Sequence, residues 1–460
     1  MNKDRYDLPE GWEWVILKDI VSALESGGRP RGGVKDIKEG VPSIGGEHLT
    51  YEGGFNFKRI RYIPNSFFNN MHRGYIEQED ILIVKDGATT GKVSFVDNTF
   101  PFKKAAINEH VFKLKVIRDQ MIPKYLFYFL FSAVGNRQIL DCLQGSAQGG
   151  INQSFINSVY VPICSLEQQK RIVQRIESLC ACLTKTKQNL TKIPPLLKKF
   201  RQSVLAKAFS GELTEDWRAK QKDLEPASKL LERIHQEHKK LLGKKYKEPE
   251  SIDTSDLPEL PEGWEWVRLG DVCTKAQYGW TTSADFEGKG LKLLRTTDIS
   301  SGIINWDGVP YCKEQPEEPQ KYLLNKGDIL VSRAGSVGVS IEIEDCPDAI
   351  FGSYLIRFKP VSPILPKYVS LYLKSTYYWN SIADKTAGIT IPNVNATKLE
   401  NLSIPISSVK EQVKIIAKIQ EFFAQADAIE KSIKIALSHC EKLTQSILAK
   451  AFRGELVGKK

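Results

Sequence analysis

One structural unit occurs twice in this chain of 460 residues, and the duplication constrains the fold more than any other feature. Three segments recur in the same order: residues 8–15 as 260–267, residues 152–163 as 395–406, and residues 203–213 as 446–456. The first match is identical (LPEGWEWV), and the last holds at nine of eleven positions. The offset falls from 252 to 243, so the second copy is about nine residues shorter inside. We therefore predict two halves with the same architecture.

The first part of each copy predicts a mixed α/β domain, which we call domain 1 (residues 1–163) and domain 2 (residues 264–406). Glycines punctuate both segments, and the short apolar runs 81–84 and 329–331 are typical of buried strands. Each run leads into a turn that contains glycine, and helical stretches are expected near 122–141 and 365–383. The chain length agrees, because 460 residues suggest about two to four domains.

The second part of each copy carries a heptad pattern. Ten positions between residues 172 and 204 are spaced four, three, four, three, and nine of them are apolar. Ten positions between 415 and 447 repeat this spacing, and all ten are apolar. Such a pattern over four heptads predicts a coiled-coil seam. The Pro194-Pro195 pair interrupts the first copy, and we expect a kink there because proline removes a backbone hydrogen bond.

These patterns give a mixed α/β fold in which two long antiparallel coiled-coil helices separate the two domains. About 40 residues of helix make a rod of roughly 60 Å, and the duplication predicts a pseudo-twofold relation. Residues 164–250 form a central helical region, with a second amphipathic helix at 226–242, and residues 251–263 form a linker. Residues 407–460 form the C-terminal coiled-coil helix.

The charge of the chain raises the expectation of a polyanionic partner without deciding it. The formal net charge is +10. Much of the excess lies in residues 167–250, which carry 20 basic and 11 acidic side chains and are expected to be helical. A solvated, lysine-rich helix face explains this distribution as well as phosphate contact does. Net charge alone therefore does not identify a partner.

Several classes of protein are disfavoured by what the sequence lacks. No run reaches about 18 apolar residues and the N-terminus is polar, so we expect no membrane span, no signal peptide and a cytoplasmic location. The only close pair among eight cysteines is Cys180 and Cys182, which lacks the usual metal or redox spacing. We expect no metal and no disulfide framework.

Common catalytic motifs are absent from the sequence or incomplete in it. Residues 87–92 (GATTGK) have one residue too few between the glycines for a phosphate loop, and the equivalent turn from Gly335 has no lysine. The sequence contains no HExxH, GxSxG or dinucleotide-binding fingerprint, and no Asn/Asp-Pro-Pro-aromatic motif of an amino-methyltransferase. We expect no active site in this chain and no cofactor of its own.

The repeated motifs resemble those of a known family. LPEGW opens each half, Gly-Asp-Ile-Leu lies midway at 327–330, and Glu79 replaces its glycine in the first copy. An Ile-Pro or Val-Pro followed by Glu-Gln opens each helix, and LAKAFxGEL closes it. The chain is similar over essentially its whole length to the specificity subunits of type I restriction-modification systems.

The resemblance implies a non-catalytic DNA-reading subunit. Two target-recognition domains would each read half of a bipartite, asymmetric site in double-stranded DNA. The subunit would recruit two modification subunits, which methylate adenine with S-adenosylmethionine, and two restriction subunits, which use ATP. Residues 278–283 (YGWTTS) differ from their counterparts 26–31 (SGGRPR), so we expect the two half-sites to differ. A rod of about 60 Å also limits the separation of the half-sites to roughly 17 base pairs.

Loop residues that can bind base edges or phosphates are the candidate DNA contacts, with an ordinary surface role as the alternative for each. In domain 1 they are Arg29, Arg31, Arg73, Lys85, Gln148 and Asn152. In domain 2 they are Thr281, Thr282, Arg295, Arg333, Ser336 and Lys385. Trp12, Trp14, Trp264 and Trp266 are expected to anchor the domain starts by packing.

The repeated helix ends are candidates for docking the modification subunits, through Lys207, Phe209, Lys450 and Phe452. Packing of these helix ends within the chain is the alternative. Two other functions remain open. A coiled-coil interaction scaffold would show no salt-dependent DNA affinity, and an enzyme with an unrecognised site would methylate or nick DNA alone.

Overall fold

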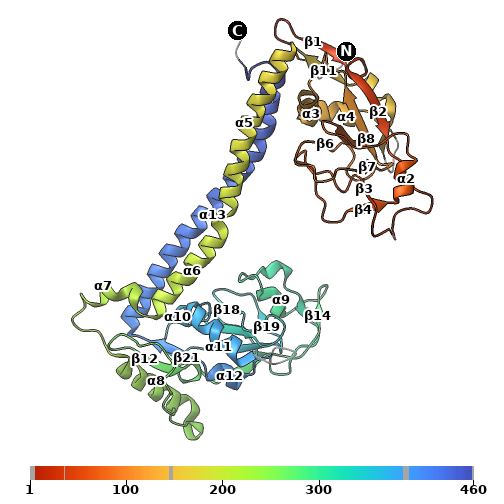
Figure 1. Ribbon diagram of the computed structural model, residues 1–460. Coiled ribbons are helices and arrows are strands. Elements are labelled where there is room, and N and C mark those ends of the chain that lie inside the picture. Colours follow the sequence, from red (N-terminus) through yellow and green to blue (C-terminus); the bar gives the residue numbers. More distant parts are fainter. Residues whose placement is uncertain (1–5, 36, 145–148, 387–392, 458–460) are drawn as a thin grey trace. The chain divides into compact units, whose positions relative to one another are not determined.

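The computed structural model describes residues 6–35, 37–144, 149–386 and 393–457 (Figure 1). The chain forms two compact units. Unit 1 contains residues 1–191 and 433–460, and unit 2 contains residues 192–432. No helix in the described part of the chain is long and apolar enough to cross a membrane.

Domain 1 lies in unit 1 and is built on two small sheets. The first is antiparallel in the order β2-β8-β5-β6, with strands Val21–Ser26, Val111–Val116, Ile81–Val84 and Val93–Phe95. The second has the order β4-β3-β7, with strands Arg61–Ile63, Val41–Ile44 and Ala106–Ile107, and β3 and β7 are parallel. Two short antiparallel pairs complete it: β1 (Glu13–Ile16) with β11 (Tyr160–Ile163), and β9 (Leu143–Gln144) with β10 (Gly150–Ile151). The helical elements are α1 (Leu17–Ile20), α2 (Asn65–Asn69), α3 (Pro123–Phe131), α4 (Ala133–Leu140) and η1 (Gln153–Asn157).

Domain 2 lies in unit 2 and repeats the order of the first sheet, whereas its second sheet has four strands instead of three. Its first sheet has the order β13-β20-β17-β18, with strands Gln277–Tyr278, Leu355–Phe358, Ile329–Ser332 and Ser340–Glu342. Its second has the order β14-β16-β15-β19, with strands Ala284–Asp285, Tyr311–Cys312, Lys292–Leu294 and Ala349–Phe351. The strands β12 (Glu265–Arg268) and β21 (Ser403–Ile406) pair as β1 and β11 do. The helical elements are η4 (Leu269–Asp271), α9 (Thr296–Ile299), η5 (Trp306–Gly308), η6 (Pro319–Lys321), α10 (Pro366–Tyr372), α11 (Thr376–Thr386) and α12 (Ala396–Glu400).

The expected helical stretches near 122–141 and 365–383 are each two helices rather than one. Ser132 separates α3 from α4, and its hydroxyl accepts a hydrogen bond from the backbone N–H of Gly135 at 3.2 Å. Ser375 lies between α10 and α11 and accepts from Tyr378 N–H at 3.3 Å. The backbone of Ser132 leaves the helical region (φ −65°, ψ 156°), so the serine that caps α4 also ends α3.

The heptad segments form long helices, as predicted. Helix α5 (Leu166–Thr191) ends one residue before α6 (Ile193–Phe209), so the Pro194-Pro195 pair coincides with an interruption at Lys192. Helix α13 (Val409–Phe452) is continuous over 44 residues; residues 409–432 belong to unit 2 and the remainder to unit 1. The seam is less buried than the pattern predicts, since Ile429 and Leu443 are 45% and 48% exposed.

Within unit 2, α6 and α13 run antiparallel. Arg201 binds Asp427 and Glu430 at 2.6 and 2.8 Å, whereas Leu213, twelve residues later, accepts a hydrogen bond from Lys418. The segment after α6 contains η2 (Glu212–Thr214), α7 (Glu215–Arg218), α8 (Ala227–Leu242) and η3 (Gly243–Lys245), which confirms the helix expected at 226–242. In unit 1, α5 lies beside the C-terminal part of α13 (Figure 1).

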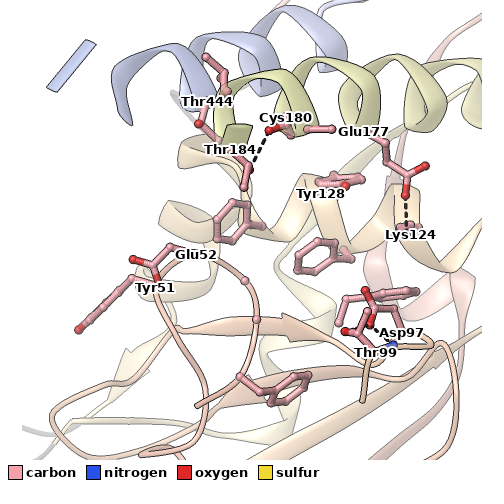
Figure 2. A pocket seen from close by; sticks show the side chains of 18 of the residues that line it. Tyr51, Glu52, Asp97, Thr99, Lys124, Tyr128, Glu177, Cys180, Thr184 and Thr444 are labelled. Carbon is pink, nitrogen blue, oxygen red and sulfur yellow. Dashed lines mark hydrogen bonds and ion pairs between the residues drawn. The ribbon is translucent and has the colours of Figure 1, made fainter. Parts of the chain in front are cut away.

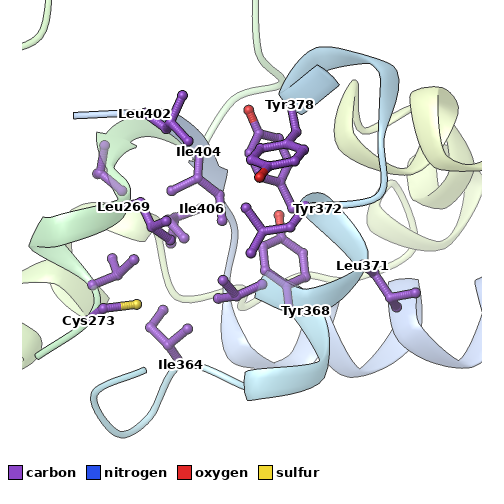
Figure 3. Packing of buried hydrophobic residues seen from close by; sticks show 14 of the residues in the cluster. Leu269, Cys273, Ile364, Tyr368, Leu371, Tyr372, Tyr378, Leu402, Ile404 and Ile406 are labelled. Atoms are coloured by element: carbon purple, nitrogen blue, oxygen red, sulfur yellow. The ribbon is translucent and has the colours of Figure 1, made fainter. Parts of the chain in front are cut away.

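Each α/β domain receives the end of a helix that is remote in sequence. In unit 2, Phe209 packs edge-on against Tyr368 and Tyr372. Figure 3 shows these two tyrosines among the aliphatic side chains of the domain 2 core. In unit 1, Phe452 packs in the same way against Tyr125 and Phe129. The helix that follows domain 1 therefore completes the core of domain 2, and the last helix completes the core of domain 1.

Candidate nucleic-acid interface

The loops at one edge of the first sheet of domain 1 meet around Lys85, which directly follows β5. The backbone N–H of Lys85 donates to the carbonyl of His110 at 2.9 Å, and its carbonyl accepts from Ile151 N–H at 2.7 Å. These bonds hold together the turn after β5, the residue before β8 and the strand β10. The Lys85 ammonium lies 3.8 Å from the Asp86 carboxylate, and the His110 ring also binds Asp86.

A recess of about 340 Å³ lies at this edge, beside the glycine-rich loop after β2. Arg29 and Glu109 form an ion pair of 3.4 Å there, and the His110 ring lies 3.5 Å from the same Glu109 carboxylate. Arg61 and Glu47 pair at 3.2 Å in the wall of the same recess. The surface therefore offers hydrogen-bond donors and acceptors side by side, which is the requirement for reading base edges.

The equivalent edge of domain 2 has the same backbone frame. Arg333 follows β17, donates its N–H to the carbonyl of Tyr354 at 2.9 Å and accepts from Val394 N–H at 3.1 Å. Its guanidinium lies over the ring of Tyr278, 4.8 Å from the centroid, and the Tyr354 side chain is 63% exposed. Cationic and aromatic groups gather here, with Ser336 exposed on the following turn.

The structure places some of the predicted DNA-contact residues together at these two edges. Others lie apart from them or already form hydrogen bonds within their own loops. Arg29 and Lys85 lie at the domain 1 edge, and Arg333 and Ser336 at the domain 2 edge. Arg31, Arg73 and Thr281 are exposed. Gln148 lies outside the described residues, as does the side chain of Lys385.

Local hydrogen bonds already occupy three predicted contacts. Asn152 caps η1 by accepting from Ser154 N–H at 2.9 Å and donates to the side chain of Gln144. Arg295 binds Asp298 through two hydrogen bonds of 2.8 and 3.0 Å at the start of α9. The hydroxyl of Thr282 accepts from the backbone of the loop after β16. These side chains stabilise their own loops.

The predicted partner-docking residues divide into two buried and two accessible side chains. Phe209 and Phe452 are buried in the domain cores described above, so packing within the chain accounts for both. Lys207 and Lys450 remain exposed at the same helix ends.

A hollow of about 940 Å³ in unit 1 lies between domain 1 and the helices α5 and α13 (Figure 2). Aromatic rings from α3 and from the loops near residues 51–57 and 95–100 line one side. Polar groups line the other, including Glu177, which binds Lys124, and Thr184, whose hydroxyl donates to the carbonyl of Cys180. Among the described residues, no three His, Cys, Asp or Glu side chains gather as a metal site.

Sequence reasoning missed the acidic and aromatic residues of the two edges. Asp86, Glu109 and His110 in domain 1, and Tyr278 and Tyr354 in domain 2, were not among the candidates because the search favoured cations, amides and hydroxyl groups. The repeat itself carries the missing signal, since His110 and Tyr354 occupy the same place before β8 and β20.

Comparisons with known proteins agree with the repeated architecture. The family described as type I restriction modification DNA specificity domain matches residues 9–194 and again 261–439. The EcoBI specificity subunit of Escherichia coli is 26% identical over 436 residues, covering 92% of this chain and 84% of the relative. The StySPI specificity subunit of Salmonella potsdam is 27% identical over 475 residues, with coverage of 98% and 91%.

Two solved structures share the fold. The specificity subunit from Thermoanaerobacter tengcongensis has a TM-score of 0.58 at 20% identity, covering 99% of this chain and all of that chain. A chain from a structural study of type I restriction-modification complex assembly has a TM-score of 0.61 at 20% identity, covering 98% and 100%. The protein belongs to the family of type I restriction-modification DNA specificity subunits.

Proposed function

We propose that domain 1 and domain 2 each read one half of a bipartite, asymmetric site in double-stranded DNA, in the cytoplasm. The observation that carries this proposal is the pair of equivalent edges. The same backbone bonds hold Lys85 beside His110 and Arg333 beside Tyr354, yet the side chains on the two frames differ. A shared frame with different side chains is what two readers of different sequences require.

The chain itself would be non-catalytic. Two modification subunits would supply adenine methylation with S-adenosylmethionine, and two restriction subunits would supply ATP-driven translocation and cleavage. The helical regions 164–250 and 407–460 would set the spacer between the half-sites and dock the modification subunits. The half-exposed Leu443 and Ile435 on α13, and the hollow beside α5 and α13 (Figure 2), support a protein partner on these helices.

Selection from random DNA duplexes tests the proposal, with the chain co-purified with its modification subunit. We expect two different short motifs at one fixed spacing. Lys85→Ala and Arg333→Ala should each weaken binding and lower the slope of log affinity against log salt by about 1, if they contact phosphate. Lys103→Ala, an exposed lysine in another loop of domain 1, is the matched control.

The competing proposal of a pure interaction scaffold predicts a different result. No motif would emerge, and any DNA binding would be absent or insensitive to salt. Methylation or nicking of DNA by the purified chain alone, supplied with S-adenosylmethionine, ATP and Mg²⁺, would instead contradict the non-catalytic role.

A further inference from the structure

We propose that Arg29 and Glu109 form the base-reading pair of domain 1 and that Thr281 and Ser353 hold the equivalent positions in domain 2. The inference rests on the proposed function and deepens it. It assigns the charged side chains of Arg29 and Glu109 to the recognition of a C·G base pair. It also predicts that domain 2, which has no charged residues at these two positions, does not recognise its half-site in this way.

The equivalence of the two pairs follows from backbone contacts. Gly27 lies so close to the chain after β7 that an added Cβ would meet the carbonyl oxygens of residues 107 and 108 at 1.9 and 2.4 Å. Gly279 has the same relation to residues 351 and 352, at 2.2 and 2.3 Å. Arg29 and Thr281 lie two residues after Gly27 and Gly279. Glu109 and Ser353 lie two residues after residues 107 and 351, whose carbonyl oxygens these glycines approach most closely. Both domains thus place these two positions on adjacent segments.

The flanking strands give the same alignment. Asn108 N–H donates to Ile44 at the end of β3, and Gly352 N–H donates to Leu294 at the end of β15, both at 2.9 Å. In domain 2, Ser353 N–H also donates to the carbonyl of Trp280 at 3.0 Å. Position 353 therefore lies beside the segment that carries Thr281, as Glu109 lies beside Arg29.

The chemistry at the two pairs differs. The Arg29 and Glu109 side chains are 58% and 31% exposed and form an ion pair of 3.4 Å. Because solvent-exposed ion pairs are weak, this one can be exchanged for contacts to a base pair at little cost. A carboxylate accepts from the amino group of cytosine, and an arginine donates to O6 and N7 of guanine. Threonine and serine supply neither charge, so domain 2 must discriminate by other contacts.

The recess around the pair supports a reading role over a purely local one. Glu47, Arg61 and His110 surround Arg29 and Glu109 with further donors and acceptors. The neighbouring Lys85 and Asp86 continue the polar surface along the edge. A base pair that meets this edge therefore finds both kinds of hydrogen-bonding group within one depression.

The test transfers the domain 2 residues into domain 1. The double variant Arg29→Thr, Glu109→Ser is selected on random duplexes as the complex with the modification subunit. We expect the domain 1 half-site to lose its C·G preference at one position, a discrimination of about 5- to 150-fold. The other positions, the domain 2 half-site and the spacer should remain unchanged.

A second variant separates base reading from loop support. Exchanging the charges, Arg29→Glu with Glu109→Arg, keeps an ion pair at the same place but swaps donor and acceptor. A reading role predicts an altered base preference at that one position, whereas a supporting role predicts the wild-type motif.

The matched control is Arg118→Thr with Glu79→Ser. This pair is also exposed, at 72% and 44%, and lies 2.6 Å apart at the opposite end of β5 and β8. We expect it to leave both motifs intact. If the Arg29–Glu109 variants also keep the wild-type motif, the inference is wrong although the proposed function stands. If the wild-type complex selects no motif, the proposed function itself fails.

Discussion

The first sheets of the two domains have the same strand order and register but balance their buried charges differently. Each central strand carries a buried cation opposite a leucine of the neighbouring strand, Lys113 in β8 and Arg357 in β20. Lys113 binds Glu25 at 2.9 Å and the carbonyl of Tyr75 at 2.7 Å. The Lys113 ammonium thereby links the loop that contains Tyr75 to the sheet. Buried polar groups need such hydrogen-bond partners within the protein in place of water.

Arg357 performs the same task with more partners. Its guanidinium binds Asp328 at 3.2 Å and Gln277 at 2.5 Å, and it donates to the carbonyls of Leu323 and Lys321. The equivalent of Asp328 in domain 1 is Asp80, which accepts from Glu77 N–H at 2.7 Å. Its second oxygen, Oδ1, is buried without a hydrogen-bond partner among the described residues. The duplicated frame is thus retained while each domain pairs its acids and bases in its own way.

A second difference concerns the start of the helix after each domain. In unit 2 the buried Glu411 accepts hydrogen bonds from Thr214, Arg218 and Trp264 at 2.7, 2.7 and 2.9 Å. In unit 1 the equivalent residue is Gln168, a partly exposed side chain that bonds locally to Ser165. Unit 2 therefore fastens the segment 210–264 to its helix through one carboxylate.

The largest expected effect is that of Glu411→Ala. Removing the carboxylate leaves the indole N–H of Trp264 without its acceptor and the guanidinium of Arg218 without its counter-ion, although Arg218 still donates to the carbonyl of Gly211. Loss of one partner from a buried ion pair costs about 3–5 kcal/mol. Amide hydrogen exchange should show the loss of protection within unit 2. The control Gln168→Ala should cost about 1 kcal/mol or less in unit 1, and equal effects of the two variants would contradict the comparison.

The second prediction concerns Asp328 and Asp80. Asp328→Asn removes the charge that neutralises Arg357 but keeps the other bonds of the guanidinium, so we expect a loss of about 2–3 kcal/mol in domain 2 at pH 7. Asp80→Asn should cause no such loss, because burial raises the pKa of Asp80 to about 6 and therefore disfavours the ionised carboxylate, which the neutral asparagine replaces.

The pH dependence gives the sign of the Asp80 effect. A carboxyl group with a pKa of about 6 in the folded state and an ordinary value of 3.8 in the unfolded state binds more protons when folded between these values. The stability of domain 1 should therefore fall as the pH rises from about 4 to 6, by up to about 3 kcal/mol. Amide hydrogen exchange measured at pH 4.5 and 7.5 should show that Asp80→Asn removes this fall in the stability of domain 1 with rising pH. An unchanged dependence on pH would contradict the assignment.

Much of this architecture could be predicted from the sequence, because the repeat and the apolar periodicity report burial directly. The strands 81–84 and 329–331 and the long helices are where the pattern placed them. The exchange of helix ends could not be predicted, since the repeat singles out Phe209 and Phe452 but shows neither that they are buried nor in which domain. Ser132 and Ser375 resemble ordinary helix residues until their capping bonds are seen.

The candidate interface was less accessible to sequence reasoning. The positions of Lys85 and Arg333 followed from the turn after a buried strand, but Glu109 resembled any acidic surface residue. Arg295 and Asn152 were plausible DNA contacts by residue type, although each forms local hydrogen bonds within three residues. Residue type identifies what a side chain can bind, whereas only the fold shows which groups it already binds.

The smallest expected effect concerns the turn before the central strand β5 or β17. Gly327 adopts φ +88° there, and Glu79 adopts φ +69° at the equivalent position, although non-glycine residues avoid this left-handed region. Glu79→Gly should stabilise domain 1 by about 0.5–1 kcal/mol, reduced by the loss of its surface ion pair with Arg118. Gly327→Ala should destabilise domain 2 by about 1–2 kcal/mol, since the new Cβ would also lie 3.2 Å from Pro366. Urea denaturation followed by hydrogen exchange assigns each change to its domain. The comparison requires that Glu79→Gly and Gly327→Ala change the stability of their domains in opposite directions. A loss of stability in both variants would mean that the Glu79 side chain, rather than its backbone conformation, decides the stability of this turn.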